Sequence, residues 1–157
     1  MRRTAPIPMY DTTHQQMTDR ILTSRLEDEA ACARLCVDFA NHLDAQRYAA
    51  VLDLFTEGGT LDRMGTVFAG RVALEGFLAS RPTDVTTRHL CTNIRVHFDA
   101  ADEATGFCCV LFFQARAEAG VPNALGPPSI VEYHDRFRRT AAGWRIEERR
   151  IRMAIQA

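Results

Sequence analysis

A histidine opens one of the strand-like segments of this sequence, where it could act as a base. His89 lies in the stretch TTRHLCTNIRVHF, 86–98, which has the composition of a β-strand. A neutral imidazole that hydrogen-bonds a carboxylate through one nitrogen has its tautomer fixed and its basicity raised, which suits a general base near neutral pH. His89 is therefore a candidate base if a carboxylate from elsewhere in the chain reaches it. The alternative is a surface or core histidine without a catalytic role.

Strict alternation along this strand would divide its side chains between two faces. One face would be apolar and carry Leu90, Ile94, Val96 and Phe98. The other would be polar and carry His89, Cys91, Asn93, Arg95 and His97. This polar face either contacts solvent or forms the wall of a pocket, and the pattern alone leaves both open.

Two candidates lie near the end of the chain. Arg149 stands among other arginines, which would fit a solvated basic face, but alternation places it with Ile151 and Met153, which favour an inward direction. A buried arginine needs an anionic partner, which either Asp135 or a substrate could supply. Tyr133 could direct its phenol into a pocket as an acid or hydrogen-bond donor, or it could be a core tyrosine with a satisfied hydroxyl.

Several kinds of chemistry find no support in the sequence. The histidines show no i,i+4 pair and no H-x-H, so we expect no metal site. The five cysteines contain no CxxC and are expected to be small buried hydrophobes in a reducing compartment. P-loop, GxGxxG and GxSxG motifs are lacking, which leaves phosphoryl transfer, dinucleotide binding and serine hydrolysis unsupported. We therefore expect an activity without a cofactor.

The composition favours one globular domain. The 157 residues are 46% hydrophobic and 25% charged, and the net charge is −1, so no strong field attracts nucleic acid or an acidic membrane. No apolar run is long enough to span a bilayer, and the segment MRRTAPIPMYDTTHQQ lacks the apolar centre of a secretory signal. We expect a cytoplasmic location and neither a nucleic-acid nor a membrane partner.

Helices precede strands along the chain. Residues 1–22 are expected to form a flexible arm, and the domain would occupy 23–157. A capping box at Ser24–Glu27 would start a long amphipathic helix that ends near Asp44. Further elements are expected in chain order: a helix in QRYAAVLDLF stopped by Glu57-Gly58-Gly59, a hairpin at 60–70, a helix at 71–80, strands near 87–99, 104–117, 129–140 and 143–155, and a loop at 117–128.

This order predicts an α+β fold, with helices packed on one face of a curved antiparallel or mixed sheet. The run GFCCVLFF, 106–113, is apolar at every position except its glycine, so that strand should be covered on both faces. Helices can cover one face only. A homodimer, or a higher homo-oligomer, is therefore expected to cover the other.

Three segments together resemble the SnoaL-like branch of the NTF2-like superfamily. They are LDAQRYAAVLDLF, TRHLCTNIRVHFDAADEATG and EYHDRFRRTAAGWRIEERRI, and the resemblance extends over nearly the whole chain from about residue 25. It implies a cone-shaped α+β domain with a deep pocket between sheet and helices. The family hosts many chemistries on this fold.

The resemblance to two enzymes of this branch implies residue roles. His89 and Asp44 are similar to the His–Asp pair of hexachlorocyclohexane dehydrochlorinase and of scytalone dehydratase, and Arg149 resembles an arginine that stabilises anionic charge in the former. Phe39 stands where the dehydrochlorinase has a lysine, and Gln114 and Leu43 stand roughly where the dehydratase has a histidine and a tyrosine. From the residues alone, Asp44 could equally be the N-cap of the next helix, an interaction worth about 1 kcal/mol. An anion at the C-terminus of the preceding helix is not favoured by the helix dipole.

The interpretation is a cofactor-independent lyase or isomerase. His89 held by Asp44 would remove a proton from a hydrophobic cyclic substrate, Arg149 would stabilise the anionic transition state, and Tyr133, Phe39, Leu43 and Gln114 would bind the substrate. One alternative is a non-catalytic NTF2-like subunit or binding domain, such as the small subunit of a ring-hydroxylating dioxygenase. Another is a polyketide cyclase, in which an aspartate rather than the histidine would be the base.

Overall fold

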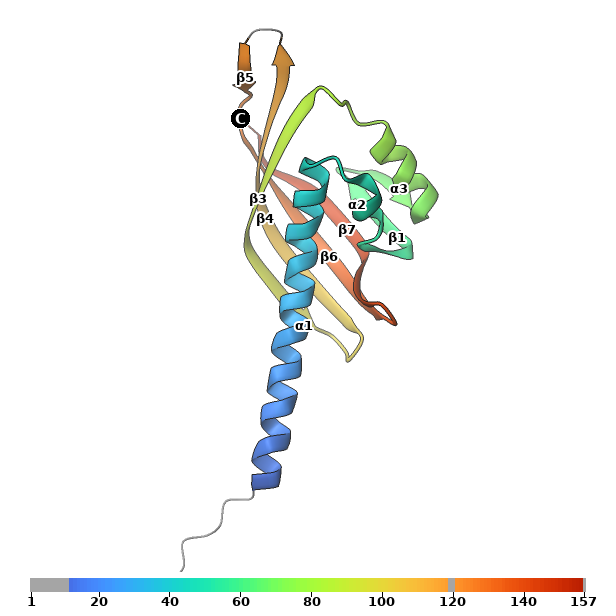
Figure 1. Cartoon of the computed structure of the whole chain (residues 1–157), viewed down its shortest axis with the longest axis vertical. Helices are drawn as coiled ribbons and strands as arrows, with labels where there is room; N and C mark the ends of the chain where they lie inside the picture. The colour runs from blue at the N-terminus through green and yellow to red at the C-terminus, as the bar shows by residue number, and fades with distance from the viewer. Residues whose placement is uncertain (1–11, 119–120, 157) are drawn as a thin grey trace, which may run out of the picture.

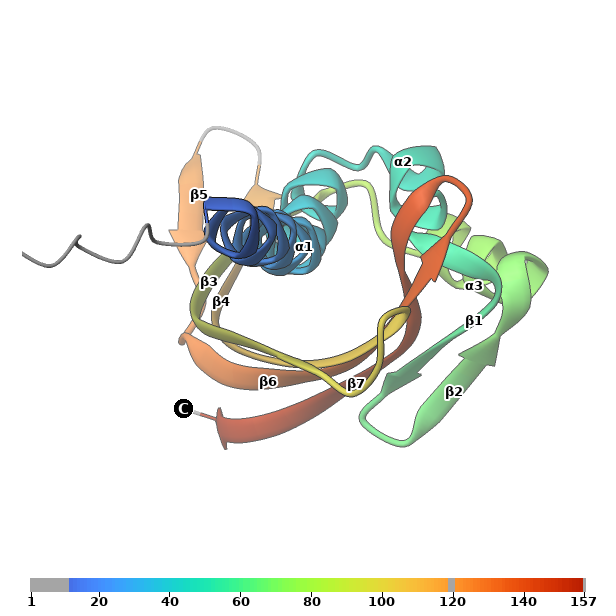
Figure 2. The same cartoon turned by 90° about the horizontal axis from the view of Figure 1, so that it is seen from below.

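The computed structural model describes residues 12–118 and 121–156, with side chains described for 16–116 and 126–156. It confirms the α+β class: helices lie inside the curve of one mixed β-sheet (Figures 1 and 2). The helices are α1 (Thr12–Asp44), α2 (Tyr48–Leu52) and α3 (Gly70–Ala79). The strands are β1 (Phe55–Arg63), β2 (Thr66–Ala69), β3 (Val85–Phe98), β4 (Glu103–Glu118), β5 (Val121–Leu125), β6 (Ser129–Thr140) and β7 (Gly143–Gln156).

The sheet has the strand order β2-β1-β7-β6-β4-β3, and β5 pairs with β4. The four long strands β3, β4, β6 and β7 form antiparallel pairs, as their turn signals predicted. The strand β1 runs parallel to β7, which makes the sheet mixed, and it carries β2 and α3 at the far edge. In Figure 2 the sheet curves around α1 from β3 to β7, and α2 and α3 lie on the side of β7 and β1.

The long first helix begins earlier than the sequence suggested. It starts at Thr12, so residues 12–22 are helical rather than a flexible arm, and the capping box at Ser24 lies inside the helix. The segment contains good helix formers and no proline or glycine after Pro8, so nothing in it ends a helix that the buried part already stabilises. Side chains 16–26 are exposed, and Figure 1 shows this half of α1 projecting beyond the sheet. Residues 1–11 lie outside the described part.

Two other expected boundaries were wrong. The predicted loop 117–128 contains β5, which continues the edge of β4 through backbone pairing that needs no apolar side-chain pattern. Glu57-Gly58-Gly59 lies within β1 and does not stop a helix, because α2 already ends at Leu52. The other strands and the helix α3 lie within a few residues of their predicted positions.

A β-bulge changes which side chains of β3 face inward. Its pairing with β4 shifts register between Thr92 and Arg95, and Asn93 has a left-handed backbone with φ 53°. The bulge adds one residue, so the alternation reverses there. His89 consequently faces inward together with residues 94, 96 and 98, whereas Leu90 is 55% exposed. The prediction that His89 and the apolar residues occupy opposite faces was wrong.

The core lies between α1 and the inner face of the sheet. The helix contributes Cys32, Cys36, Phe39 and Leu43, and the strands contribute Cys108, Val110, Tyr133, Phe137 and Ile146, among others. Along β4 the inward residues Ala104, Cys108 and Val110 are buried, whereas the outward residues Phe107, Cys109, Leu111 and Phe113 are only partly buried. One face of the apolar run is therefore covered within the chain, and a homodimer on the other face stays a prediction. No described helix has the length and apolarity needed to cross a membrane.

The packing of β4 against β6 generates a stability prediction. A Cβ added to Gly106 would lie 2.5 Å from Cε2 of Phe137, whose ring is buried, so Gly106→Ala should overpack the core and lower the free energy of unfolding by about 1–3 kcal/mol. Gly76→Ala in α3 is the control, since its Cβ would meet nothing within 4 Å, and it should stabilise by about 0.5–1 kcal/mol. Urea unfolding measures both. A Gly106→Ala variant as stable as the native protein would contradict the packing.

Candidate active site

The end of α1 and the start of β3 meet through one carboxylate. Oδ1 of Asp44 accepts hydrogen bonds from Nδ1 of His89 at 2.5 Å and from the Thr87 hydroxyl at 2.7 Å. Oδ2 accepts one from the backbone N–H of His89 at 2.8 Å. Both the position of the strand and the orientation of the imidazole are thus fixed by Asp44.

The aspartate is arranged to remain ionised. Burial alone would raise the pKa of Asp44, but the hydrogen bonds from the His89 ring, Thr87 and the His89 backbone together hold this pKa below its ordinary value. The side chains of His89 and Asp44 are only 8% and 12% exposed. An ionised Asp44 favours the tautomer with hydrogen on Nδ1, which leaves a lone pair on Nε2 for proton abstraction.

The alternative role of Asp44 as an N-cap was wrong. The residue before α2 is Arg47, whose side chain makes no capping hydrogen bond. Asp44 is instead the last residue of α1, where the helix dipole disfavours an anion. Its hydrogen bonds with Thr87 and His89 offset that cost, because hydrogen bonds to a charged acceptor are the stronger kind.

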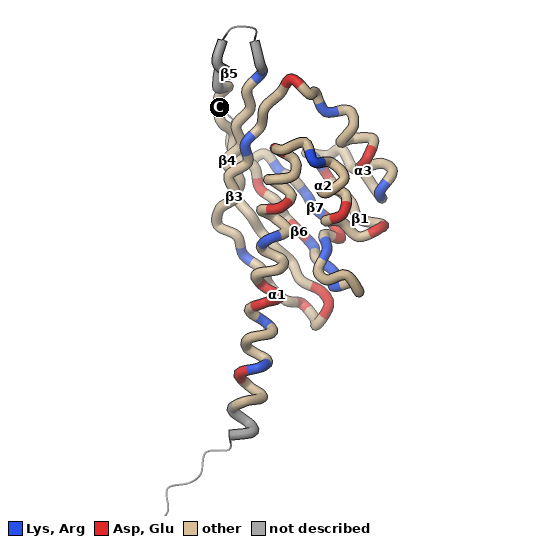
Figure 3. The backbone as a smooth tube through the Cα atoms, viewed as in Figure 1, with Lys and Arg blue, Asp and Glu red and all other residues tan. Residues whose placement is uncertain are grey.

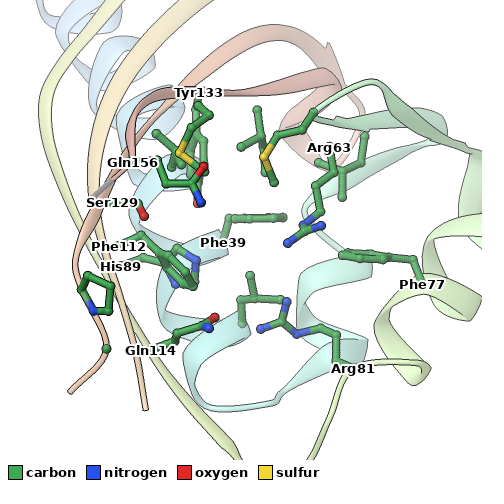
Figure 4. Close-up of a pocket in the computed structure, with 18 residues that line it drawn as sticks. Phe39, Arg63, Phe77, Arg81, His89, Phe112, Gln114, Ser129, Tyr133 and Gln156 are labelled. Atoms are coloured by element: carbon green, nitrogen blue, oxygen red, sulfur yellow. The ribbon is translucent and has the colours of Figure 1, made fainter. Parts of the chain in front are cut away.

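His89 forms part of the wall of a cavity of about 330 Å³, a size typical of small-molecule sites (Figure 4). Four more of the sequence-predicted residues line it: Phe39, Leu43, Gln114 and Tyr133. Phe112 stacks at a tilt on the imidazole, with ring centroids 4.8 Å apart. Most of the lining residues are apolar, and several polar side chains stand among them, which suits a hydrophobic ligand that must be held in one orientation.

Arg149 is not among the residues that line this cavity. It is completely buried and pairs with Asp135 through Nε–Oδ1 at 2.8 Å and Nη2–Oδ2 at 2.6 Å. Its guanidinium carbon lies 4.4 Å from the ring centroids of both Phe39 and Tyr133, which do line the cavity. Of the two anionic partners considered from the sequence, the structure supplies Asp135. Arg149 supports the wall from behind.

Tyr133 lines the cavity as a neutral phenol. Burial is the main reason that its pKa is raised above the ordinary value, so the hydroxyl keeps its proton and is suited to donating a hydrogen bond. Its ring meets Phe39 edge to face, with centroids 5.8 Å apart. Within the described side chains we find no hydrogen bond of the Tyr133 hydroxyl, which leaves it available to a ligand.

The cysteines behave as buried small residues. All five are free thiols, and three of them, Cys32, Cys36 and Cys108, belong to the core. Burial raises the pKa of Cys32 to about 12, so this thiol stays protonated. Cys36 donates to Oδ2 of Asp135 at 3.4 Å and so helps to hold the ion pair behind the wall. Among the described residues there is no group of three or more His, Cys, Asp or Glu that could hold a metal ion.

Sequence reasoning missed several residues of the site. Arg63 at the end of β1, Arg81 just after α3 and Phe77 within α3 all line the cavity, although none of them lies on the strand that carries His89. Thr87 was passed over because a threonine in a strand is ordinary, yet its hydroxyl orients Asp44. The only available signal was its position two residues before His89, on the same face of the strand.

The fold and site together define an α+β cone with a His–Asp pair in the wall of a cavity, and comparison with known proteins places the chain within a family. The family model described as a SnoaL-like domain matches residues 24–150, so the chain belongs to the SnoaL-like family of the NTF2-like superfamily. This confirms the resemblance seen in the sequence. A comparison with curated proteins gave no match.

Solved structures from Novosphingobium aromaticivorans share the fold. A candidate scytalone dehydratase has 24% identity and a TM-score of 0.72, with 88% of this chain and 89% of that chain covered. An NTF2-like protein with a cystatin-like fold has 24% identity and a TM-score of 0.68, with coverage of 95% and 94%. A candidate aromatic ring hydroxylase has 22% identity and a TM-score of 0.70, with coverage of 83% and 92%.

The buried ion pair behind the cavity wall generates a second stability prediction. Arg149→Met leaves the Asp135 carboxylate buried without its partner and should cost about 3–5 kcal/mol of unfolding free energy. The neighbouring Arg150→Met removes an exposed pair with Glu148 and should cost no more than about 1 kcal/mol. Chemical unfolding of both variants tests this. Equal losses in the two variants would contradict a structural role for the Arg149–Asp135 pair.

The lowered pKa of Asp44 predicts how stability depends on pH. A carboxyl whose pKa is lower in the folded chain stabilises the fold at pH values above its unfolded pKa, about 3.9, and this contribution disappears as the pH falls through the folded pKa. The native protein should therefore exceed Asp44→Asn in stability at neutral pH, and the gap should close below about pH 4. Thr87→Val removes one of the hydrogen bonds to Asp44, so at neutral pH its stability should lie between those of the native protein and Asp44→Asn.

Urea unfolding of the native protein, Asp44→Asn and Thr87→Val, repeated from pH 7 down to pH 3, measures this gap. A difference between the native protein and Asp44→Asn that stays constant over this range would show that the carboxylate is not held ionised by its hydrogen bonds.

Proposed function

We propose that this chain is a cofactor-independent lyase or isomerase that removes a proton from a hydrophobic cyclic substrate bound in the cavity. His89 is the general base, and Asp44 orients its ring and stabilises the imidazolium that forms when it takes a proton. The observation that carries the proposal is the 2.5 Å contact between Nδ1 of His89 and the Asp44 carboxylate, on a histidine that lines an open cavity. The family membership and the likeness to a candidate dehydratase support it.

The proposed step transfers one proton. The Nε2 lone pair of His89 takes a proton from a carbon of the substrate, and the electron pair of that C–H bond forms a new double bond. In an elimination the leaving group departs from the neighbouring carbon with the electron pair of its own bond. In an isomerisation the electron pair enters an adjacent unsaturated group of the substrate, and the imidazolium returns the proton to another carbon. The imidazolium that forms is stabilised by Asp44, and the Tyr133 hydroxyl can hydrogen-bond an oxygen of the substrate.

The cavity and the His89–Asp44 pair also bear on the two alternatives, a non-catalytic subunit and a cyclase with an aspartate base. In a non-catalytic subunit no ligand need enter the cone, whereas here polar groups from Gln114, Tyr133 and His89 converge on a cavity. In a cyclase with an aspartate base, the carboxylate itself would have to reach the substrate, but Asp44 is not among the lining residues and stands behind His89. These observations favour the histidine base. A homodimer and a cytoplasmic location remain further proposals.

The activity test uses 5-nitrobenzisoxazole, a bicyclic compound whose ring opens when a base removes its one acidic C–H proton. We expect the native protein to accelerate this reaction, and His89→Gln to lower kcat/KM by about 10²–10⁴-fold because the general base is lost. His97→Gln is the matched control, since it removes a histidine of the same strand whose side chain is 80% exposed. Absorbance of the phenolate product reports the rate, and circular dichroism checks the fold.

Equal rates for the native protein and His89→Gln would refute the histidine base. Asp44→Asn separates the cyclase alternative: a large loss in Asp44→Asn, with activity retained in His89→Gln, would assign the base to the aspartate. We expect losses in both variants, with the larger in His89→Gln.

A further inference from the structure

We propose that the natural substrate carries a carboxylate, and that Arg63 and Arg81 bind it on the side of the cavity opposite His89. This inference rests on the proposed function only in taking the cavity as the substrate site. It names the class of substrate, which the His–Asp pair alone does not.

The charges on the cavity wall are one-sided. Two of the described lining residues are arginines, and none of the described lining residues is an aspartate or a glutamate. Asp44 and Asp135 lie behind the wall, where His89 and Arg149 already pair with them. The described lining therefore presents two positive charges and no carboxylate to a ligand, and a partly enclosed site whose wall carries one sign of charge favours a ligand of the opposite sign.

Arg63 and Arg81 have no anionic partner among the described side chains. Arg63 and Arg81 form no ion pair there, although most arginines of the sheet do. The carboxylate nearest in sequence to Arg63 is Asp62, which binds Arg152 instead at 2.7 Å. Nε of Arg81 is buried without a hydrogen-bond partner in the described structure, so the described chain does not use up the hydrogen-bonding capacity of this guanidinium.

The two side chains converge although they come from separate elements. Arg63 is the last residue of β1, and Arg81 follows the end of α3. Figure 4 shows both guanidinium groups directed into the cavity, across from His89 and on either side of Phe77. Guanidinium groups bind carboxylates through paired, charge-assisted hydrogen bonds, so two of them can hold one carboxylate firmly.

Such an anchor would give His89 a defined target. A substrate held by its carboxylate at one side has its apolar ring against Phe39, Leu43 and Phe77 and presents a ring carbon to the base at the other side. Fixing the reacting carbon near the base contributes to the rate through orientation. The base and the binding group then act on separate parts of one molecule.

The test compares acids with amides of the same shape. Binding of benzoate, cyclohexanecarboxylate and 2-naphthoate, and of the three corresponding carboxamides, is measured by isothermal titration calorimetry at low ionic strength. We expect the best acid to bind at least about tenfold more tightly than its amide, because charge-assisted hydrogen bonds are lost in the amide. Added salt should reduce this preference, since Arg63 is exposed.

Variants assign the preference to the two arginines. Arg63→Met and Arg81→Met should each reduce acid binding by about tenfold and leave amide binding unchanged. Arg81→Lys, which keeps the charge of this part-buried residue, should retain most of the preference. Arg95→Met is the control, because it removes an exposed arginine outside the cavity on β3.

Binding is read without turnover, so the outcome is independent of the base. His89→Gln should bind the acids with the native preference even if it turns nothing over. Equal binding of acids and amides, binding of neither in all three pairs, or an acid preference that survives in both Arg→Met variants would each overturn the carboxylate proposal. None of these results would by itself refute His89 as the base.

Discussion

The site depends on the carboxylate of Asp44, the last residue of the long helix α1, which binds residues in the first half of the facing strand β3. Asp44 accepts from the ring and the backbone of His89 and from Thr87, so a single side chain sets the register of β3 against α1 and the tautomer of the imidazole. Without it, the helix end and the strand would be joined mainly by apolar packing, which fixes distance but not the rotation of a ring. The same interaction therefore serves the fold and the proposed chemistry.

A second buried charge pair supports the wall on the side of Phe39 and Tyr133. Arg149 and Asp135 face each other across neighbouring strands, and the guanidinium lies over both rings. The desolvation of such a pair is costly, and its bidentate geometry and the Cys36 thiol offset that cost. Asp44 and Asp135 face His89 and Arg149 rather than the cavity, so Arg63 and Arg81 are the charged side chains that the described lining presents to a ligand, apart from His89.

Much of this arrangement could be predicted from local patterns, and the part that could not depends on tertiary contacts. The end of α1 at Asp44 and the strands around Thr140-Ala-Ala-Gly143 follow from periodicity and turn residues. The bulge at Asn93 does not, because its left-handed backbone is favourable only once β3 pairs with β4. Arg149 could be recognised as inward but not as paired with Asp135. Arg63 and Arg81 gave no signal, since only the folded chain shows that they line the cavity and form no ion pair with a described carboxylate.

The bulge explains how one strand can serve two purposes. Before Asn93 the inward side chains of β3 are polar enough to meet Asp44 and line a cavity; after it they are apolar and pack beneath α1. A regular strand with this sequence would place His89 on the face opposite Ile94 and Val96, so that either the base or the core would face solvent. The extra residue at Asn93 removes that conflict, because it turns His89, Ile94 and Val96 to the same face of the sheet. The bulge, more than the presence of a histidine, therefore makes a buried base possible on this sheet.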